Sequence, residues 1–509
     1  MPDPSPFVFA KIIATLGPAS DTAEKIAKLI LEGARVFRIN FSHGSFEGYG
    51  KLLAAIREAS RMTGIHAGAL GDLCGPKLRI GEVIEGGVHV AVGESIVIQK
   101  KPTVAGKDAL WAVPGHDVRA IFSTNSPAVI EDVKPGERLL INDGEVRTLV
   151  LDKQGAGDNQ YVVCRVTIGG PITKGKGINL PDTGMSVPSL TPHDFKCIEW
   201  AVKSGIDFLA LSFVRKGDDV RQLKQHLASV MPGGAFPIPV ISKIEKPQAL
   251  DDLEAIVDLS DGIMVARGDL GVEMDVTDVP AIQKRIIEMA HGRGKPVIVA
   301  TQMLQSMIEN ATPTRAEVSD VANAIYDGAG KVMLSGETAV GKYPVLAVQT
   351  MSRVANVTIQ RIMEGHTNDV WKQPPVWRES GKRSAALSNG VRQIVRDFGA
   401  KFVAIWSQTG GGAKYLSISR VGVPIIAVSN DLRGLQRMSW YFGVHAVHME
   451  PPSNIEVLAY AFDQMVLEKK WAAKGDPYVL CAGEPLGTGG TTNTASLRYV
   501  GGKPLAAGA

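Results

Sequence analysis

Cysteine and aromatic residues are scarce in this chain of 509 residues. Its 4 cysteines are scattered and lack the paired spacing of a metal site, so we expect neither a disulfide scaffold nor a structural zinc site. No apolar run is long enough to span a membrane, and the first residues lack the pattern of a signal peptide. These absences predict a cytoplasmic protein with no membrane partner.

A strong excess of charge is also missing. The formal net charge is +3, and Lys and Arg form no stripe with interleaved aromatic side chains. We therefore expect no nucleic-acid partner, although local anion sites remain open. A chain of this length with 45% hydrophobic residues can bury large cores and is expected to form more than one domain.

What the chain does have is a regular alternation of strand-like and helix-like patterns. Apolar runs of strand length are each followed by a helical pattern, and eight such units predict a closed (β/α)₈ TIM barrel over residues 1–77 and 178–363. The expected strands are 11–17, 34–42, 67–73, 207–214, 239–245, 262–268, 296–301 and 331–337.

Two regions depart from this alternation. Residues 78–177 are rich in Val, Gly and Ile, and Asp143-Gly144 is a hairpin signal, so we expect an inserted β-rich domain that covers the barrel mouth as a lid. After a polar link at 365–375, strand-like runs alternate again with helices. Residues 364–509 are therefore expected to form a C-terminal open α/β domain of three layers.

Residues 239–269 carry the clearest chemical signal, because they read as strand, helix and strand. Alternation places Lys243 and Glu245 on one side of the first strand and Arg267 and Asp269 on one side of the second. Two carboxylates at adjacent strand ends suit Mg²⁺, whose shell is completed by water and substrate oxygens. A Lys-x-Glu pair at a strand end is, by itself, more often a solvated ion pair.

Polar residues also end most of the other expected barrel strands. They are Arg38, Asn40, Ser42, Asp72, Thr301, Ser335 and Glu337. Such a set at one end of a barrel predicts a catalytic mouth. Its content suits a phosphorylated, enolisable acid, with the metal and Arg38 binding phosphate and Lys243 stabilising an enolate oxygen.

Glycine-rich loops add one candidate anion site. Residues 407–412, SQTGGG, stand between a strand and a helix, where backbone N–H groups can face a phosphate, although a flexible loop fits this pattern equally well. Residues 336–342 nearly match a phosphate-binding P-loop. Tyr343 replaces the required Ser or Thr, which excludes that site.

These segments resemble the pyruvate kinase family along nearly the whole chain. The stretches that carry the resemblance are IIATLGPAS, ARVFRINFSHG, DLCGPKLRIG, VISKIEKPQAL, GIMVARGDLG, ATQMLQSM, TRAEVSDVANAIYDG and LSGETAVGKYP. The resemblance implies phosphoryl transfer from phosphoenolpyruvate to ADP, giving pyruvate and ATP in glycolysis. It further implies Mg²⁺ (or Mn²⁺) on Glu245 and Asp269, and a homotetramer.

The resemblance also assigns roles to individual residues. Those implied for catalysis and substrate binding are Lys243, Arg38, Thr301, Gly268 and Asp269. Those implied for nucleotide binding are Asn40, His43, Arg79 and Lys176. The SQTGGG loop lacks the Lys and Arg of the pattern that responds to fructose bisphosphate, so we expect a sugar monophosphate or nucleotide monophosphate as effector. Its candidate ligands are Ser407, Thr409, Gly410, Gly411 and Gly412.

Many pyruvate kinases need a monovalent cation, and the resemblance locates that site as well. Asn40, Ser42 and Asp72 match its side chains, whereas Leu73 stands where the family has a threonine that offers its carbonyl. Lys77 occupies the position where potassium-dependent members carry Glu and potassium-independent members carry Lys. A fixed ammonium can supply the positive field of a bound K⁺, so we expect that K⁺ is not required.

Two other functions remain compatible with a barrel of this kind. One is a metal-dependent lyase or aldolase that acts through a pyruvate enolate, which would not need the inserted lid, Arg38 or the Asn40 and Ser42 pair. The other is a catalytically inactive barrel that binds a metabolite. The intact lysine, carboxylates and threonine at the strand ends argue against the second alternative.

Overall fold

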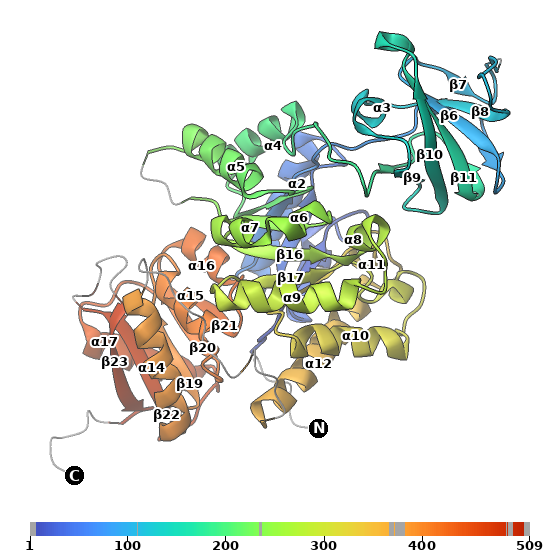
Figure 1. Ribbon diagram of the computed structural model, residues 1–509. Coiled ribbons are helices and arrows are strands. Elements are labelled where there is room, and N and C mark those ends of the chain that lie inside the picture. Colours follow the sequence, from blue (N-terminus) through green and yellow to red (C-terminus); the bar gives the residue numbers. More distant parts are fainter. Residues whose placement is uncertain are drawn as a thin grey trace.

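The protein is elongated and has three parts (Figure 1). The computed structural model describes residues 7–108, 110–233, 237–365, 371, 382–484, 486 and 492–502. The β-rich insertion and the C-terminal domain lie at opposite ends, with the barrel between them (Figure 1). Most of the predicted link at 365–375 lies outside the described residues. No helix within the described ranges has both the length and the apolar character needed to cross a membrane.

The predicted barrel is confirmed, since eight strands close in the order β1-β18-β17-β16-β15-β14-β3-β2, all parallel. They are β1 (Lys11–Thr15), β2 (Ala34–Asn40), β3 (Gly68–Asp72), β14 (Phe208–Leu211), β15 (Val240–Ile244), β16 (Gly262–Ala266), β17 (Val297–Ala300) and β18 (Lys331–Leu334). Most of their side chains are buried, as expected for strands that have helices outside and packed side chains inside.

Helices cover the barrel from outside. They are α1 (Ala23–Leu31), α2 (Phe46–Thr63), α4 (Pro192–Ser204), α5 (Gly217–Val230), α6 (Gln248–Asp251), α7 (Leu253–Leu259), α9 (Val279–Gly292), α10 (Arg315–Tyr326) and α12 (Pro344–Met363). Local chemistry fixes several of their ends. Thr191 and Thr314 begin α4 and α10 with capping boxes, and Gly205 ends α4 in the left-handed conformation.

Two predictions for residues 239–269 are wrong in detail. Strand β16 ends at Ala266, and Arg267–Glu273 form a short helix, α8, so Arg267 and Asp269 do not alternate along a strand. The single helix expected over 247–261 is interrupted at Asp252, which separates α6 from α7. A short buried helix and a buried strand are both apolar, and periodicity over so few residues cannot separate them.

The insertion folds as a β-domain with its own apolar core. Its main sheet has the order β13-β9-β10-β11-β6-β8, and β12-β5 and β4-β7 form two smaller sheets. The elements are β4 (Glu82–Val83), β5 (Val88–Val90), β6 (Ser95–Gln99), β7 (Val104–Ala105), β8 (Val118–Ser123), α3 (Ala128–Asp132), β9 (Arg138–Ile141), β10 (Val146–Gln154), η1 (Gly157–Asn159), β11 (Tyr161–Ile168), β12 (Gly170–Ile172) and β13 (Ile178–Asn179). The turn at Asp143-Gly144 joins β9 to β10, as its sequence predicts.

Two chain segments connect this domain to the barrel, and they run antiparallel. The N–H of Ile80 donates to the carbonyl of Lys176 at 2.9 Å, and that of Ile178 donates to the carbonyl of Leu78, also at 2.9 Å. The sheet of the insertion continues past residue 177, because β13 pairs with β9. This connection, called the hinge below, is thus a hydrogen-bonded pair of segments, and Leu78, Lys176 and Ile178 line the cavity between the insertion and the barrel.

The C-terminal domain is an α/β sandwich of three layers. Its sheet has the order β21-β20-β19-β22-β23. The elements are α14 (Lys382–Phe398), β19 (Phe402–Trp406), α15 (Gly411–Ile418), β20 (Ile425–Ser429), α16 (Leu432–Met438), β21 (Val444–His448), α17 (Ile455–Glu468), β22 (Pro477–Gly483) and β23 (Thr492–Tyr499). The four expected parallel strands are confirmed. The antiparallel edge strand β23 was not predicted, because its side chains are polar and half-exposed.

Candidate active site

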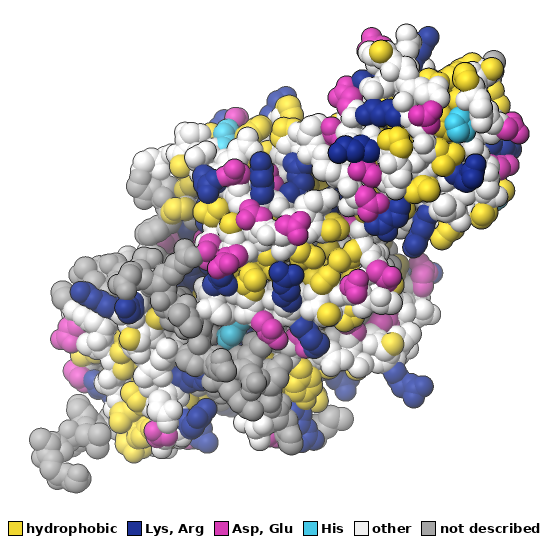
Figure 2. Space-filling view, viewed as in Figure 1, with side chains coloured by type: hydrophobic (Ala, Val, Ile, Leu, Met, Phe, Trp, Pro, Cys, Tyr) yellow, Lys and Arg dark blue, Asp and Glu magenta, His cyan; other side chains and the backbone are white. Residues whose placement is uncertain are grey.

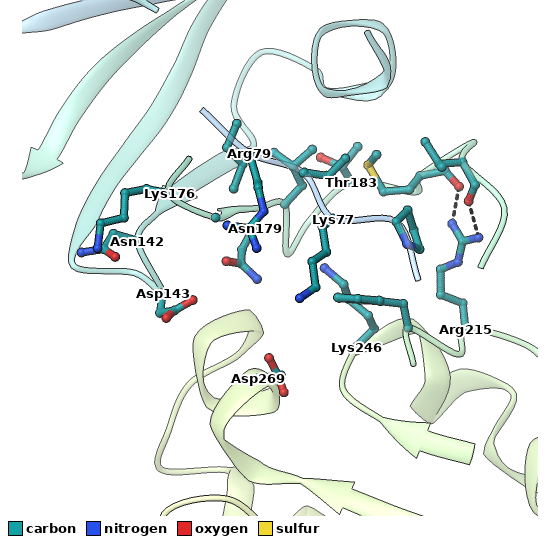
Figure 3. Close-up of a pocket in the computed structure, with 18 of the residues that line it drawn as sticks. Lys77, Arg79, Asn142, Asp143, Lys176, Asn179, Thr183, Arg215, Lys246 and Asp269 are labelled. Atoms are coloured by element: carbon teal, nitrogen blue, oxygen red, sulfur yellow. Dashed lines mark hydrogen bonds between the residues drawn. The ribbon is translucent and has the colours of Figure 1, made fainter. Parts of the chain in front are cut away.

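A cavity of ≈ 380 Å³ lies where the inserted domain faces the carboxyl ends of the barrel strands. Figure 3 shows Lys77 reaching from the hinge toward Asp269, with Arg79 and Lys246 nearby. Five cationic side chains and two carboxylates line it. On the surface where the insertion meets the barrel, Lys and Arg lie among Asp and Glu (Figure 2). A cleft with this excess of positive charge attracts an anionic ligand.

A buried ionic network forms the barrel side of this region. Asp72, at the end of β3, accepts hydrogen bonds from Arg38 Nε at 2.7 Å and, through Oδ1, from Ser212 Oγ at 3.3 Å. Lys243, on β15, donates to Ser212 Oγ at 2.7 Å and lies 3.4 Å from Asp72. Three separate strands therefore bring one carboxylate and two cations to a single spot, as the strand ends predicted.

The charges in this network stabilise one another. Burial alone would raise the pKa of Asp72, but Lys243 and Arg38 outweigh it and hold that pKa below its usual value. Burial would likewise lower the pKa of Lys243, whereas Asp72 and Glu245 raise it above its ordinary value. Lys243 therefore stays an ammonium, and it is fixed in place before any substrate arrives.

Glu245 and Asp269 form the candidate metal site. Glu245 follows β15 and is buried, with Oε1 2.8 Å from Lys243 Nζ and Oε2 accepting the N–H of Phe213 at 2.8 Å. Asp269 lies on α8 and faces the cavity. Burial raises the pKa of Glu245, and the charge of Asp269 adds to that rise despite Lys243. Burial also raises the pKa of Asp269, and the charges of Asp143, Asp72 and Glu273 add to that rise although Lys243 opposes it. A divalent cation bound by the two carboxylates would stabilise their charged forms.

No described group of three or more His, Cys, Asp and Glu side chains could hold a metal by itself. This agrees with a hard cation held by two carboxylates, whose remaining ligands come from water and substrate. The residues present thus fit Mg²⁺ or Mn²⁺ better than a metal that demands a full protein cage.

Thr301 and Gly268 form the next part of the mouth. Thr301 follows β17 with a φ of +73°, which is strained for a β-branched residue. Its Oγ1 accepts the N–H of Gly268 at 2.6 Å, and Arg267 Nη2 donates to its carbonyl at 3.0 Å. Arg267 also pairs with Asp320. Arg267, expected on the same side of a strand as Asp269, instead holds the loop that carries Thr301.

The residues proposed for the monovalent cation adjoin the same network. Asn40 ends β2, and its Oδ1 accepts the N–H of Ser42 at 3.1 Å. Leu73 is buried, and its N–H donates to the carbonyl of Ala210 at 3.0 Å. Asp72 is already bonded to two cations. Asn40 and Asp72 therefore lie side by side on neighbouring strands. Arg38 and Lys243 already balance most of the negative charge of Asp72.

Four of the basic groups expected near the nucleotide or the potassium site also gather here. The pKa of His43 is lowered, first by partial burial and then by the nearby charges of Lys77, Arg79 and Arg38. Arg79 donates to the carbonyl of Gly175 at 2.6 Å, and Lys176 lines the cavity beside it. The pKa of Lys77 is lowered by partial burial, then by Arg79. Lys77 thus lies in the site, at a place where its charge acts on the network.

The loop proposed for an effector phosphate lies far along the chain, before α15. Gly410 has a φ of +84° and precedes the first turn, and Ser407 Oγ accepts the N–H of Ala413 at 3.3 Å. A Cβ on Gly412 would lie 2.5 Å from Thr492 Oγ1, so packing against β23 already requires that glycine. The candidate phosphate ligands are therefore uncharged: the hydroxyls of Ser407 and Thr409 and the backbone N–H groups of the glycines.

The structure adds residues that strand-end reasoning missed. Ser212 joins Lys243 to Asp72, and its place just after β14 was a usable signal. Glu273, on α8, is 1% exposed, and its Oε1 accepts Lys246 Nζ and, at 2.7 Å, Asn179 Nδ2 from the inserted sheet. Glu273 thus connects the insertion to the barrel, and no local sequence pattern predicts this contact. We call Glu273 with its two partners the joint.

Comparison with known proteins identifies this arrangement. Residues 9–348 match the family model described as "Pyruvate kinase, barrel domain", and residues 385–497 match "Pyruvate kinase, alpha/beta domain". The chain belongs to the pyruvate kinase family. Members of the pyruvate kinase family are phosphotransferases of glycolysis that use phosphoenolpyruvate and ADP and need a divalent metal. The comparisons do not support a lyase or an inactive barrel.

Similar proteins span the whole chain. A pyruvate kinase of Mycobacterium tuberculosis is 39% identical over 493 residues, covering 96% of this chain and 98% of the relative. One from Mycobacterium intracellulare is 40% identical over 493 residues, with the same coverage. A crystal structure of a pyruvate kinase from Cryptosporidium parvum has a TM-score of 0.84 and 31% identity, covering 97% of this chain and 96% of that one.

The geometry of Glu245 and Asp269 predicts a shared metal. Glu245→Gln and Asp269→Asn should each weaken the binding of Mn²⁺ and Mg²⁺, because each removes an anionic hard ligand. The double variant should lose less than the two single losses added together, since both act on one ion. Mn²⁺ binding followed by electron paramagnetic resonance measures this without relying on turnover.

Glu254→Gln is the matched control, because that exposed carboxylate on α7 pairs with Arg293 outside the cavity. It should bind Mn²⁺ like the unaltered protein. Additive losses in the double variant, together with an unchanged Mg²⁺ requirement, would place the metal elsewhere.

Proposed function

We propose that the protein transfers the phosphoryl group of phosphoenolpyruvate to ADP, giving pyruvate and ATP, and that Mg²⁺ (or Mn²⁺) is the divalent metal. The observation that carries this proposal is the buried Lys243, which lies between Asp72 and Glu245, with Arg38 bound to the same Asp72. Lys246, three residues further along the chain, lines the cationic cavity. A permanent ammonium at such a place stabilises an oxygen that gains negative charge during the reaction.

In this proposal Arg38 and Lys243 bind the phosphoryl oxygens of phosphoenolpyruvate. The bond between phosphorus and the enol oxygen breaks, an oxygen of the ADP β-phosphate forms the new bond to phosphorus, and the enolate then takes a proton to become pyruvate. Lys243 stabilises the enolate oxygen as its charge grows. When bound to Glu245 and Asp269, Mg²⁺ supplies positive charge that offsets the phosphate and carboxylate charges.

The remaining groups bind and orient the two substrates. Gly268 and Thr301 would hold the carboxylate end of phosphoenolpyruvate, since the strained Thr301 backbone is fixed by its bonds to Gly268 and Arg267. Asn40, His43, Arg79 and Lys176 would bind the nucleotide. The last two belong to the hinge of the insertion, so residues 78–177 would act as a lid that excludes water once ADP is bound.

The C-terminal domain would serve regulation and assembly. Residues 364–509 would form a regulatory domain, with residues 1–77 and 178–363 as the catalytic barrel, and the chain would assemble as a homotetramer. Ser407, Thr409, Gly410, Gly411 and Gly412 would bind one phosphate of a sugar monophosphate or nucleotide monophosphate. The support for a single phosphate is that the loop carries no Lys or Arg for a second.

Lys243→Met tests the proposed activity. The purified protein should form pyruvate from phosphoenolpyruvate and ADP in a lactate-dehydrogenase-coupled assay, and the variant should lose about 10²–10³ in kcat, because one preorganised electrostatic donor is gone. Substrate binding should change less than turnover. Lys284→Met, a surface lysine that pairs with Asp327, is the control and should keep full activity. A Lys243→Met protein with more than half of the original turnover would remove Lys243 from the mechanism.

Lys77 predicts independence from potassium. We expect near-full activity in tetramethylammonium buffers free of K⁺, with Mg²⁺ still required, because the Lys77 ammonium already supplies positive charge near the phosphates. Lys77→Glu should lower activity, and K⁺ should restore part of it. Lys174→Glu makes the same charge change on the outer surface, where Lys174 pairs with Glu82, and should create no K⁺ response. A many-fold activation of the unaltered protein by K⁺ at equal ionic strength would show that Asn40, Ser42 and Asp72 still bind the ion.

The effector loop is tested with a substitution that the backbone accepts. A Cβ on Gly411 would meet only Thr409 Oγ1, at 3.9 Å, so Gly411→Ala and Gly411→Asp should both fold. If the loop binds phosphate, a monophosphate effector should lower the phosphoenolpyruvate concentration needed for half-maximal rate. Gly411→Asp should abolish that response by repulsion, while Gly411→Ala keeps most of it. Strong activation by fructose bisphosphate would contradict the expected effector class.

A further inference from the structure

The floor of the barrel, opposite the active site, contains two lysines side by side. Lys11 on β1 pairs in register with Lys331 on β18, and each is 1% exposed. Lys11 Nζ donates to the carbonyls of Val8 at 2.8 Å and Val444 at 2.7 Å. Lys331 Nζ lies 4.4 Å from the centre of the Trp440 ring, and the described residues give it no hydrogen-bond acceptor. Within the described part of the chain, Lys331 thus has an aromatic ring beside its amino group where Lys11 has two carbonyls.

A guanidinium from the C-terminal domain approaches the same floor. Arg420 follows α15, and its guanidinium carbon lies 3.7 Å from the ring centre of Trp371 and 4.9 Å from that of Phe442. Its Nη2 donates to the carbonyl of Gly328, whereas its Nη1 is buried without a partner among the described residues. A guanidinium fixed between two rings, with one N–H group unused, is already positioned for an acceptor.

A small cavity of ≈ 30 Å³ lies between the barrel and the C-terminal domain and is lined by both Lys331 and Arg420. None of the described residues that line it carries a carboxylate. The space suits one or two water molecules or a monatomic ion, and it is too small for a phosphate or sulfate. Two buried cations whose described neighbours in the cavity include no acid are costly unless a counterion joins them or one gives up its proton.

The surrounding charges agree with this deficit. Burial lowers the pKa of Lys331 well below its ordinary value, and the neighbouring Arg420 lowers it further. Burial and then Arg392 lower the pKa of Arg420 to about 9. The charges that lower the two pKa values, Arg420 acting on Lys331 and Arg392 acting on Arg420, are both positive. An anion in this space would therefore stabilise the charged forms of Lys331 and Arg420.

We propose that the cavity between Lys331 and Arg420 binds a halide-sized monovalent anion, with chloride as the physiological candidate. The anion accepts hydrogen bonds from Arg420 Nη1 and Lys331 Nζ, and it links strand β18 of the barrel to the end of α15. The site is separate from the catalytic cleft, because it lies at the opposite ends of the barrel strands. It therefore predicts a halide effect on stability that does not require substrate or metal.

The test has two measurements on the full-length protein. Crystals grown or soaked in bromide should show an anomalous peak between Lys331 Nζ and Arg420 Nη1. In solution, replacing gluconate with chloride at constant ionic strength should raise the melting temperature to a plateau, because a ligand that binds only the folded state stabilises it. Gluconate is the reference anion because it is too large for the cavity.

Variants identify the cations responsible. Lys331→Met and Arg420→Met should each lose the chloride-dependent rise. Lys295→Met is the matched control, since Lys295 lines the same cavity but donates to the carbonyls of Asp258 and Ser260, and it should keep the rise. The absence of a bromide peak, or an equal chloride response in Lys331→Met and the unaltered protein, would overturn the proposal. The bromide measurement uses the unaltered protein and so stands even if a variant fails to fold.

Discussion

The buried carboxylate of Asp72 is the constraint on which the catalytic mouth depends. It binds Arg38 and lies beside Lys243, two cations from different strands that would otherwise repel each other at this depth. Removing one member of such a buried network leaves uncompensated charge and costs several kcal/mol, in the range of about 3–5. The charge of Asp72 thus holds a lysine and an arginine together at the ends of the barrel strands.

The surroundings shift the pKa of Asp72 in one direction and the pKa values of Glu245 and Asp269 in the other. Asp72 has two cationic neighbours and a lowered pKa, so its charge is satisfied within the protein. Burial raises the pKa values of Glu245 and Asp269, and Lys243 only partly offsets that rise. One acid is thus paired with the protein's own cations, and the other two, with raised pKa values, are the pair proposed to bind the metal. This difference separates the structural carboxylate from the proposed ligands more clearly than residue type can.

Local patterns predicted the parts of the structure that local physics determines. Strand alternation correctly brought Lys243 and Glu245 together, and the Asp143-Gly144 turn correctly marked a hairpin. The rest depends on contacts between distant segments. Arg267 pairs with Asp320, which lies 53 residues further along the chain. The polar strand β23 is a strand only because it pairs with β22. No periodicity in the sequence encodes such partners.

The joint at Glu273 has a consequence for how this chain can vary. Glu245 and Lys246 are consecutive, yet Glu245 pairs with Lys243, whereas Lys246 reaches Glu273, which also binds Asn179 of the insertion. A one-residue insertion or deletion here would exchange the two directions and disturb both functions together. Among the described residues, no hydrogen bond or ion pair joins the outer strands β6, β8 and β11 of the insertion to the barrel, so their lengths are less constrained. Related enzymes should therefore differ in length at the outer strands of the insertion and keep a constant length at the segments that attach it to the barrel.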